Sequence, residues 1–339
     1  MSATGYNIDL RDVYFVLFEQ LKVQEALSEF ERYEDFDQET YVSMIEEATR
    51  IAKEVIWPMN RNGDVGCTFH GDGKVTTPPG TKEAWDVLVE SGLIGFNAPF
   101  DQGGSNLPEP VAMAVGEALT GAGPAFSTYG GLSRGAANLL AHHANDFLKD
   151  NCVENLNTGA WCGTMCLTEA GAGSSVGDNR CKATPNEDHY LLEGEKIFIT
   201  GGDHDLTENI VHLVLARLPD APAGSKGLSL FAVPKFGFEG TPFAGQRNGA
   251  YVVGIEHKMG LNGSATCTLE LGGKAPCHGY VIGQPGDGMR IMFGMMNEAR
   301  IMVGIQGLSS ASAAYENALA YAKERVQGNN VKSFGDPEA

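Results

Sequence analysis

The sequence predicts an α+β protein built from three successive parts. Apolar residues recur at helical spacing through the N-terminal part, alternate with polar residues after Trp161, and return to helical spacing from Gly288. We therefore expect a helical N-terminal domain, a middle domain of short strands forming a small antiparallel β-barrel or sandwich, and the start of a C-terminal α-helical bundle. The predicted domains are residues 1–160, 161–285 and 286–339.

The longest helical pattern of the N-terminal part covers Thr40–Trp57. Its apolar positions, among them Tyr41, Ile45 and Ile51, share one face, and the pattern stops at Pro58 because proline interrupts a helix. Further segments with helical spacing are Lys82–Ser91, Pro110–Leu119 and Leu132–Leu148.

The middle part consists of short β-type runs bounded by Gly, Asp or Pro. No regular alternation of strands with helices is visible, so a doubly wound parallel sheet is not expected. The runs are Tyr190–Leu192, Lys196–Thr200, Ile210–Ala216, Leu228–Val233, Tyr251–Ile255 and Cys267–Leu271.

The last helical pattern begins at Gly288 and ends near Arg325, which gives a helix of roughly 35–40 residues and about 55 Å. A helix of this length needs packing partners along most of its course. The apolar stripe from Ile301 to Ala322 is therefore expected to stay exposed in this chain and to favour association or disorder.

The charge balance limits the classes of partner. The chain carries 43 acidic and 24 basic residues, a net charge of −19, which repels nucleic acid and anionic membrane surfaces. Neither partner is expected. An anionic small molecule can still bind, through local backbone N–H groups or a placed arginine.

Targeting and cysteine patterns predict a cytoplasmic protein. Acidic residues interrupt the N-terminal apolar positions, and no run of about 18 apolar residues occurs, so neither a secretory signal nor a membrane span is expected. The seven cysteines include no C-x-x-C pair, which favours reduced, mostly buried thiols over a disulfide framework or a zinc site.

The segment from Met165 to Ser175, with the sequence MCLTEAGAGSS, carries the most functional information. Its small residues let a backbone approach a flat or phosphorylated ligand closely, with main-chain N–H groups as donors. A plain tight loop is the alternative. The segment is not a dinucleotide fingerprint, because it lacks the third glycine and the strand-to-helix context.

Two later segments add side chains suited to a ring-shaped ligand. Lys196–Thr200 places the Phe198 ring and the Thr200 hydroxyl on one face of a strand, an arrangement that can stack on and hydrogen-bond to a heteroaromatic ring. Glu256–Thr266 is a turn rich in small polar residues. Ordinary core and ordinary turn are the alternative interpretations.

Taken in order, these segments resemble the acyl-CoA dehydrogenase family over nearly the whole chain. Residues 165–175 match its flavin segment, with Ser175 in place of Asp, and Lys196–Thr200 match its Lys-x-Trp-Ile-Thr strand, with Phe198 in place of Trp. Further matching segments are Lys258–Ser264, Asn297–Arg300 with Asn297 in place of Asp, and Tyr321–Gln327. The phrase Gly202–Asp205 resembles the long bacterial sub-group that includes 3-methylmercaptopropionyl-CoA dehydrogenases.

The resemblance implies an FAD site between the β-domain and the C-terminal helices, with an acyl-CoA thioester on the other face of the flavin. The residues it assigns to FAD are Met165, Leu167, Thr168, Gly173, Ser174, Phe198, Ile199, Thr200, Arg325 and Gln327, the last two reaching a neighbouring subunit. The residues it assigns to acyl-CoA are Ser174, Asn297 and Arg300. No metal is implied.

The implied reaction is α,β-dehydrogenation of an acyl-CoA to the 2-enoyl-CoA, with electrons passed to an electron-transfer flavoprotein. The family's catalytic glutamate is expected beyond Ala339, together with the rest of the C-terminal bundle, so no catalytic residue is assigned here. The resemblance also implies a homodimer or homotetramer.

Three other functions are alternatives. An acyl-CoA oxidase would reoxidise the flavin with O₂, and a non-catalytic flavin- or CoA-binding fragment would fit the absent base. A metal enzyme built on His142–His143 or Asp203–Asp205 is disfavoured, since adjacent side chains point to different faces.

Overall fold

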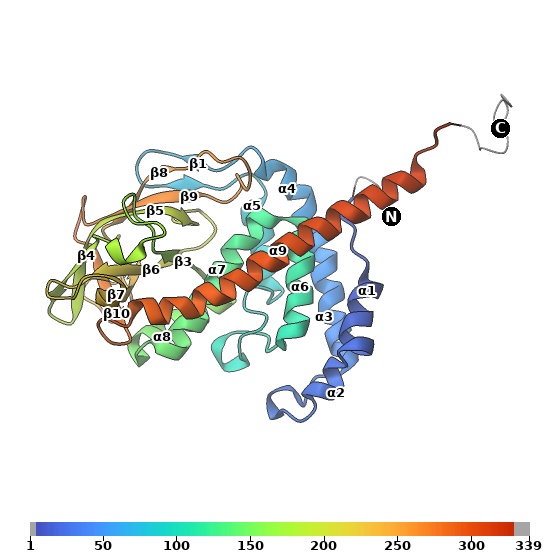
Figure 1. Ribbon diagram of the computed structural model, residues 1–339, viewed down its shortest axis with the longest axis horizontal. Helices are drawn as coiled ribbons and strands as arrows, with labels where there is room; N and C mark the ends of the chain where they lie inside the picture. The colour runs from blue at the N-terminus through green and yellow to red at the C-terminus, as the bar shows by residue number, and fades with distance from the viewer. Residues whose placement is uncertain (1–4, 329–339) are drawn as a thin grey trace.

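The computed structural model describes residues 5–328 and has the expected α+β architecture. Helices lie on one side and a curved sheet on the other, and one long helix, α9 (Gly288–Glu324), runs from the sheet across the helices (Figure 1). The α+β prediction is confirmed. The domain boundaries at residues 160 and 285 stay predictions, because element positions alone do not test them.

The helical part differs from its prediction in two places. The helix that begins at Gln38 does not stop at Pro58, because a π-helical turn, Ala52–Ile56, carries it on into α4. Pro58 lies just after this π-helical turn, where the regular hydrogen-bond pattern is already interrupted, so its missing N–H costs less than in an uninterrupted α-helix. The helices before α9 are α1 (Leu10–Tyr14), α2 (Val23–Leu27), α3 (Gln38–Ile51), α4 (Trp57–Gly63), α5 (Thr81–Glu90), α6 (Glu109–Ala122), α7 (Pro124–His143) and α8 (Asp146–Thr158).

The second difference is the break between α7 and α8, where a single helix over Leu132–Leu148 was expected. Ala144 adopts an extended conformation, and Asn145 caps α8 by accepting a hydrogen bond from the Leu148 N–H at 3.0 Å. Asparagine at this position satisfies a donor that the new helix would otherwise leave unpaired. The chain therefore turns here, and α8 folds back against α7 (Figure 1).

The sheet closes on itself as a small barrel, one of the two arrangements expected. Strand β10 pairs with both β7 and β5, so β10, β7, β6, β4 and β5 form a ring, which β9 and β8 extend. The strands are β3 (Trp161–Cys166), β4 (Lys182–Asn186), β5 (His189–Thr200), β6 (Asn209–Arg217), β7 (Leu228–Pro234), β8 (Ala250–Ile255), β9 (Thr266–Leu271) and β10 (His278–Ile282).

Strand direction departs from a purely antiparallel arrangement. Strand β3 runs parallel to β6, with Trp161 opposite Asn209 and Cys166 opposite Val214, and β4 meets β6 in parallel at one position. In both pairings the two strands are joined by a long connection, because the chain must cross back before a second strand can run parallel to the first. Single-strand periodicity gives no information about such long-range pairing.

A two-stranded hairpin, β1 (Thr68–Phe69) and β2 (Val75–Thr76), lies within the helical part of the sequence but docks on the barrel. Asp203 Oδ2 accepts from the Val75 N–H at 2.9 Å, and Asp205 Oδ1 accepts from the Thr77 N–H at 2.9 Å. Between them, burial lowers the pKa of His204 to about 3, aided by the Lys235 charge, so this imidazole is neutral. The Asp203–Asp205 segment thus anchors the hairpin.

The helices and the barrel share a continuous interior. One buried cluster joins α7 and α8 to β3, β6, β7 and the first turns of α9. All seven cysteines are free thiols, and six are buried, as expected. Beyond these first turns, α9 exposes apolar side chains, including Ile301 at 61% exposure, Leu308 and Tyr315. Within residues 5–328, no helix is both long enough and apolar enough to span a membrane.

Helix α7 approaches β3 closely because residue 163 is glycine. A Cβ at Gly163 would lie 2.4 Å from the Ala136 Cβ, whereas one at Gly171 would have nothing within 4 Å. We expect Gly163→Ala to destabilise the fold by about 1–3 kcal/mol through overpacking. Gly171→Ala is the matched control and should leave the urea midpoint unchanged. Equal midpoints for the two variants in urea denaturation would contradict close α7–β3 packing.

Candidate functional site

A buried lysine joins the two most informative motifs of the sequence. The Lys196 side chain is 0% exposed, and its Nζ donates to the Leu167 carbonyl at 3.0 Å and to Glu169 Oε1 at 2.8 Å. It also donates to Asn179 Oδ1. The backbone adds a further link, since the Ile197 N–H donates to the Thr168 carbonyl at 2.9 Å. Strand β5 is thereby fixed against the 165–175 segment.

Glu169 is held on the opposite side by the backbone. The N–H groups of Arg180 and Cys181 donate to its two oxygens at 2.6 and 3.0 Å. Burial acts to raise the pKa of Glu169, but Lys196 and these N–H groups outweigh it, so the pKa lies below its ordinary value. Glu169 is therefore a charged structural anchor, engaged on both oxygens and not free to accept a substrate proton.

The strand changes direction directly after this anchor. The β5–β9 register shifts between Lys196 and Ile199, and Phe198 adopts a left-handed φ of 58°. As a result Phe198 is 58% exposed, while Ile199 is buried in the barrel core. A bulky residue with positive φ is an outlier that the surroundings must maintain. The bulge presents an aromatic face to the outside of the barrel.

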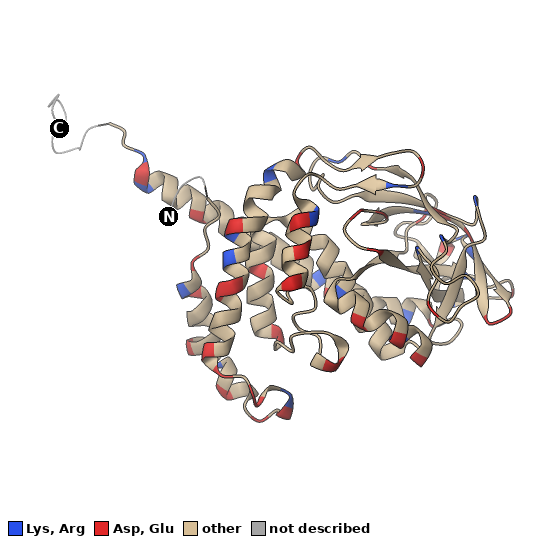
Figure 2. Ribbon diagram, turned by 180° about the vertical axis from the view of Figure 1, so that it is seen from behind, with Lys and Arg blue, Asp and Glu red and all other residues tan. Residues whose placement is uncertain are grey.

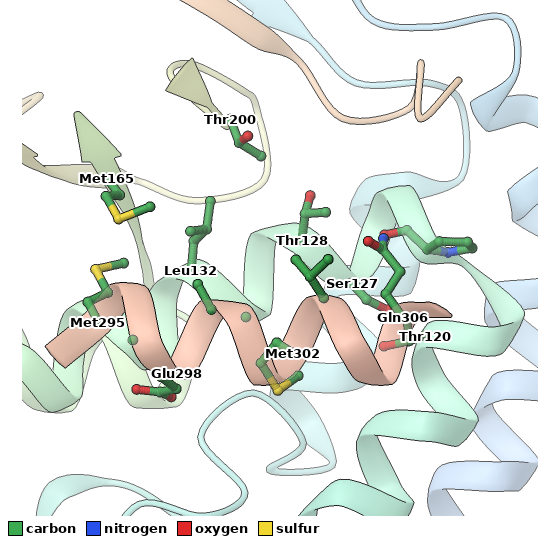
Figure 3. A pocket seen from close by; sticks show the side chains of 15 residues that line it. Thr120, Ser127, Thr128, Leu132, Met165, Thr200, Met295, Glu298, Met302 and Gln306 are labelled. Carbon is green, nitrogen blue, oxygen red and sulfur yellow. The ribbon is translucent and has the colours of Figure 1, made fainter. Parts of the chain in front are cut away.

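A pocket of about 260 Å³ lies where the strands meet α7 and α9 (Figure 3). Met165, from β3, and Thr200, from β5, both line it, so two of the predicted flavin residues reach one cavity. Met165 and Met295 point toward each other across it in Figure 3. The other lining residues are Thr120, Pro124, Ser127, Thr128, Gly131, Leu132, Gly135, Glu298, Ala299, Met302, Val303 and Gln306.

Helix α9 contributes a regular stripe to this pocket. Met295, Ala299, Met302 and Gln306 follow the three- and four-residue spacing of one helix face. Glu298 is the one titratable side chain among the lining residues. The methionines come from β3 and α9, and α7 supplies mainly small side chains. The cavity is therefore largely apolar.

The Glu298 carboxylate has a distinct electrostatic environment. Burial raises its pKa, and this effect exceeds the opposing effects of an Asn138 hydrogen bond at 3.3 Å and the Arg134 charge. The charge of Glu109 raises the pKa of Glu298 further. Arg134 stacks 4.1 Å above the centre of the Phe96 ring, and burial lowers its pKa to about 10. The surroundings of Glu298 therefore favour its neutral form more than water does.

The turn at residues 258–264 also reaches the pocket wall. Lys258 Nζ donates to the Ser264 carbonyl at 2.9 Å, and the Ser264 hydroxyl lies 2.9 Å from the Thr128 hydroxyl, which lines the cavity. Thr128 and Lys196 are residues that sequence reasoning did not assign. The position of Lys196 at the start of the matched Lys196–Thr200 segment was its only signal, whereas Thr128 lies in a plain helical pattern and gave none.

Other predicted residues lie outside this pocket. Gly173 and Ser174 are exposed in the loop after Glu169. Asn297 and Arg300 are exposed on α9, where Arg300 Nη1 donates to Asn297 Oδ1 at 2.8 Å. Arg325 and Gln327 are exposed after the end of α9, and neither lines the pocket. Their assignments stay predictions.

The histidine and aspartate candidates for a metal have other contacts. His142 Nδ1 lies 2.8 Å from the Asn138 carbonyl, and Asp203 and Asp205 bind the hairpin backbone. Over residues 5–328, no group of three or more His, Cys, Asp or Glu side chains is arranged to hold a metal ion.

Comparison with known proteins identifies the family. Residues 164–273 match the acyl-CoA dehydrogenase middle domain, and residues 286–334 match the acyl-CoA dehydrogenase C-terminal domain. The chain is 39% identical over 327 residues to the 3-methylmercaptopropionyl-CoA dehydrogenase of Ruegeria pomeroyi, covering 96% of this chain and 55% of that protein. This chain belongs to the acyl-CoA dehydrogenase family.

Other acyl-CoA dehydrogenases are similar to this chain as well. A broad-specificity linear acyl-CoA dehydrogenase of Mycobacterium tuberculosis is 40% identical over 343 residues, covering 98% of this chain and 55% of that protein. The chain thus spans about half the length of the curated relatives it matches. The butyryl-CoA dehydrogenase structure of Megasphaera elsdenii superposes with a TM-score of 0.69 at 24% identity, over 88% of this chain and 73% of that chain, and shows the shared fold. The family depends on FAD, and an acyl-CoA dehydrogenase of Bacillus anthracis has been solved with it.

Breaking the buried Lys196–Glu169 pair should be costly. Glu169→Gln leaves a buried ammonium without its counter-charge, and we expect a loss of roughly 3–5 kcal/mol in unfolding free energy. Glu54→Gln, which disrupts an exposed pair with Arg50, is the control and should leave the urea midpoint unchanged. Because the pKa of Glu169 is lowered by folding, its stabilisation is present at neutral pH and is lost as pH falls through the folded-state pKa. A Gln variant as stable as the parent at pH 7 would refute this role.

Proposed function

We propose that this chain carries the flavin and acyl-CoA site of an FAD-dependent acyl-CoA dehydrogenase. The observation that carries the proposal is the pocket between the two flavin motifs and α9, in which Met165 and Thr200 face an apolar helix stripe. A cavity bounded by methionines and small residues suits an alkyl chain. The whole protein would convert an acyl-CoA to the 2-enoyl-CoA.

The residues around the bulge fit a flavin. The exposed Phe198 ring offers an apolar face, and its positive φ keeps that face outside the barrel. The hydroxyls of Thr168 and Thr200 make no hydrogen bond with any described residue, so both are free to bind polar ring atoms. Met165, Leu167 and Ile199 complete the proposed ring site, and Gly173 and Ser174 would approach the phosphates.

The substrate would lie along α9. Its acyl end would enter the pocket beside Met295 and Met302, while Ser174, Asn297 and Arg300 would contact the CoA portion. When bound, FAD supplies the redox chemistry, by accepting the hydride that leaves Cβ. This chain's residues exclude water with their methionines and orient the thioester between the strand ends and the helix. None of the residues described here is assigned as the base.

The proposed partners follow from the same site. An electron-transfer flavoprotein would accept the electrons, and a second copy of the chain would contribute Arg325 and Gln327 to the FAD diphosphate. Arginine suits this role, because its planar fork binds phosphate oxygens in pairs.

The proposal is tested by purifying the protein with excess FAD, recording its visible spectrum, and adding a panel of acyl-CoA thioesters without oxygen. We expect bound flavin, seen as visible absorbance; bleaching of that band by a thioester requires, in addition, the catalytic base, which is not assigned to any described residue. Peroxide formation on admitting oxygen would identify an oxidase instead. Colourless protein, or flavin that no thioester bleaches, would leave the activity unsupported in these 339 residues.

Glu298 should make ligand binding depend on pH. Burying an alkyl chain beside this carboxyl favours its neutral form, so binding should strengthen as pH falls through its raised pKa. Glu298→Gln should remove that dependence while keeping the shape of the wall. The measurement is acyl-CoA affinity by titration from pH 5 to 8 in parent and variant. Parallel pH profiles would argue against a titrating Glu298.

A further inference from the structure

A group of basic residues lines a cleft of about 580 Å³ outside the pocket described above. Arg180 and Lys182 are exposed at the start of β4, and Arg217 lies at the end of β6. Basic residues are scarce in this chain, 24 against 43 acidic ones, and acidic positions predominate along the helices in Figure 2. This cleft, with three basic side chains, is therefore locally positive in a protein whose net charge is negative.

The arrangement leaves like charges side by side. Lys182 and Arg217 are direct register partners of β4 and β6, so their side chains leave the sheet on the same face. Neighbouring cations repel one another unless an anion lies between them. Glu193 is the β5 partner of Lys182, yet no ion pair joins them, and Arg180 and Lys182 form no ion pair or side-chain hydrogen bond within residues 5–328. Both side chains have donors available for a ligand.

Arg217 connects this cleft to the loop of the proposed CoA contacts. Its Nη2 donates to the Gly177 carbonyl at 2.8 Å and to the Gly224 carbonyl at 3.1 Å. Gly177 lies three residues after Ser174, so the guanidinium fixes the end of the glycine- and serine-rich loop. A nucleotide-bearing ligand that contacts Ser174 therefore has cations available on the continuing chain.

We propose that Arg180 and Lys182, positioned by Arg217, form a binding site for a phosphate group of a nucleotide ligand. The proposal rests on the proposed function for the source of the phosphate, which is either the nucleotide end of CoA or the diphosphate of FAD. Both ligands present the same chemistry, oxygen anions that accept charge-assisted hydrogen bonds. In an acidic protein, such a local site offsets the repulsion that an anionic ligand meets elsewhere.

The test is the double variant Arg180→Gln/Lys182→Gln, titrated with CoA, with dephospho-CoA, which lacks the 3′-phosphate, and with FAD. We expect CoA affinity to fall about 10-fold and the preference for CoA over dephospho-CoA to disappear. A fall in FAD affinity alone would support the same phosphate site with FAD as the source. Arg61→Gln/Lys53→Gln, which removes the same charges from exposed helical positions, should change neither affinity.

Two measurements keep the outcome interpretable. Arg180→Lys/Lys182→Arg preserves both charges and should retain affinity, which separates lost charge from altered folding. Inorganic pyrophosphate should compete with the bound nucleotide in the parent and lose this effect in the Gln variant. Unchanged CoA, FAD and pyrophosphate binding in that variant, with flavin bleaching intact, would overturn the phosphate site and leave the proposed function standing. If pyrophosphate binds through these residues but no thioester bleaches the flavin, the phosphate site stands and the proposed function loses its support.

Discussion

The buried Lys196–Glu169 pair is the constraint on which the rest of the site depends. A lysine with no exposed surface needs its charge satisfied, and it is satisfied by a carboxylate, a carbonyl and an amide, all from the chain between Leu167 and Asn179. The 165–175 loop therefore cannot leave β5 without exposing a costly unpaired charge. This requirement also explains the bulge, because strand β5 must turn Lys196 inward and then present Phe198 outward within two residues.

The pocket depends on a second constraint, the path of α9. Its first turns are buried against the barrel, so the helix leaves the sheet at a fixed angle and crosses α7 and α6. The pocket opens where this crossing passes the ends of β3 and β5. Since α9 touches both parts of the molecule, a shift of one helical turn would replace Met295, Ala299 and Met302 with a different set of side chains. The apolar character of the wall is thus a property of helix register as much as of composition.

The spacing of apolar residues predicted most helices and strands of the fold. It did not predict the pairings between residues far apart in the sequence. Helical spacing predicted α9 to within a residue or two, because a 37-residue pattern contains many repeats. The family resemblance assigned Met165 and Thr200 to the flavin, and the structure places both in the wall of one cavity. The parallel partner of β3, the hairpin on the barrel and the contact of Ser264 with Thr128 join residues far apart in sequence, and no local period records them. The prediction that the helix stops at Pro58 was wrong, because a proline that follows a π-helical turn can lie within a continuous helix.

At each site, the surroundings of a charged group determine its role. Where a charge is buried, as at Lys196, the fold provides a counter-charge within hydrogen-bond distance, and the group is structural. Where a carboxyl lies in an apolar wall near an amide, a guanidinium and a second carboxylate, as at Glu298, burial and the like charge raise its pKa. Where cations stand together at a surface without an ion pair among the described residues, as at Arg180 and Lys182, a bound anion would supply the counter-charge. An acidic protein that binds the proposed anionic ligands would need the third case, because its net charge repels them.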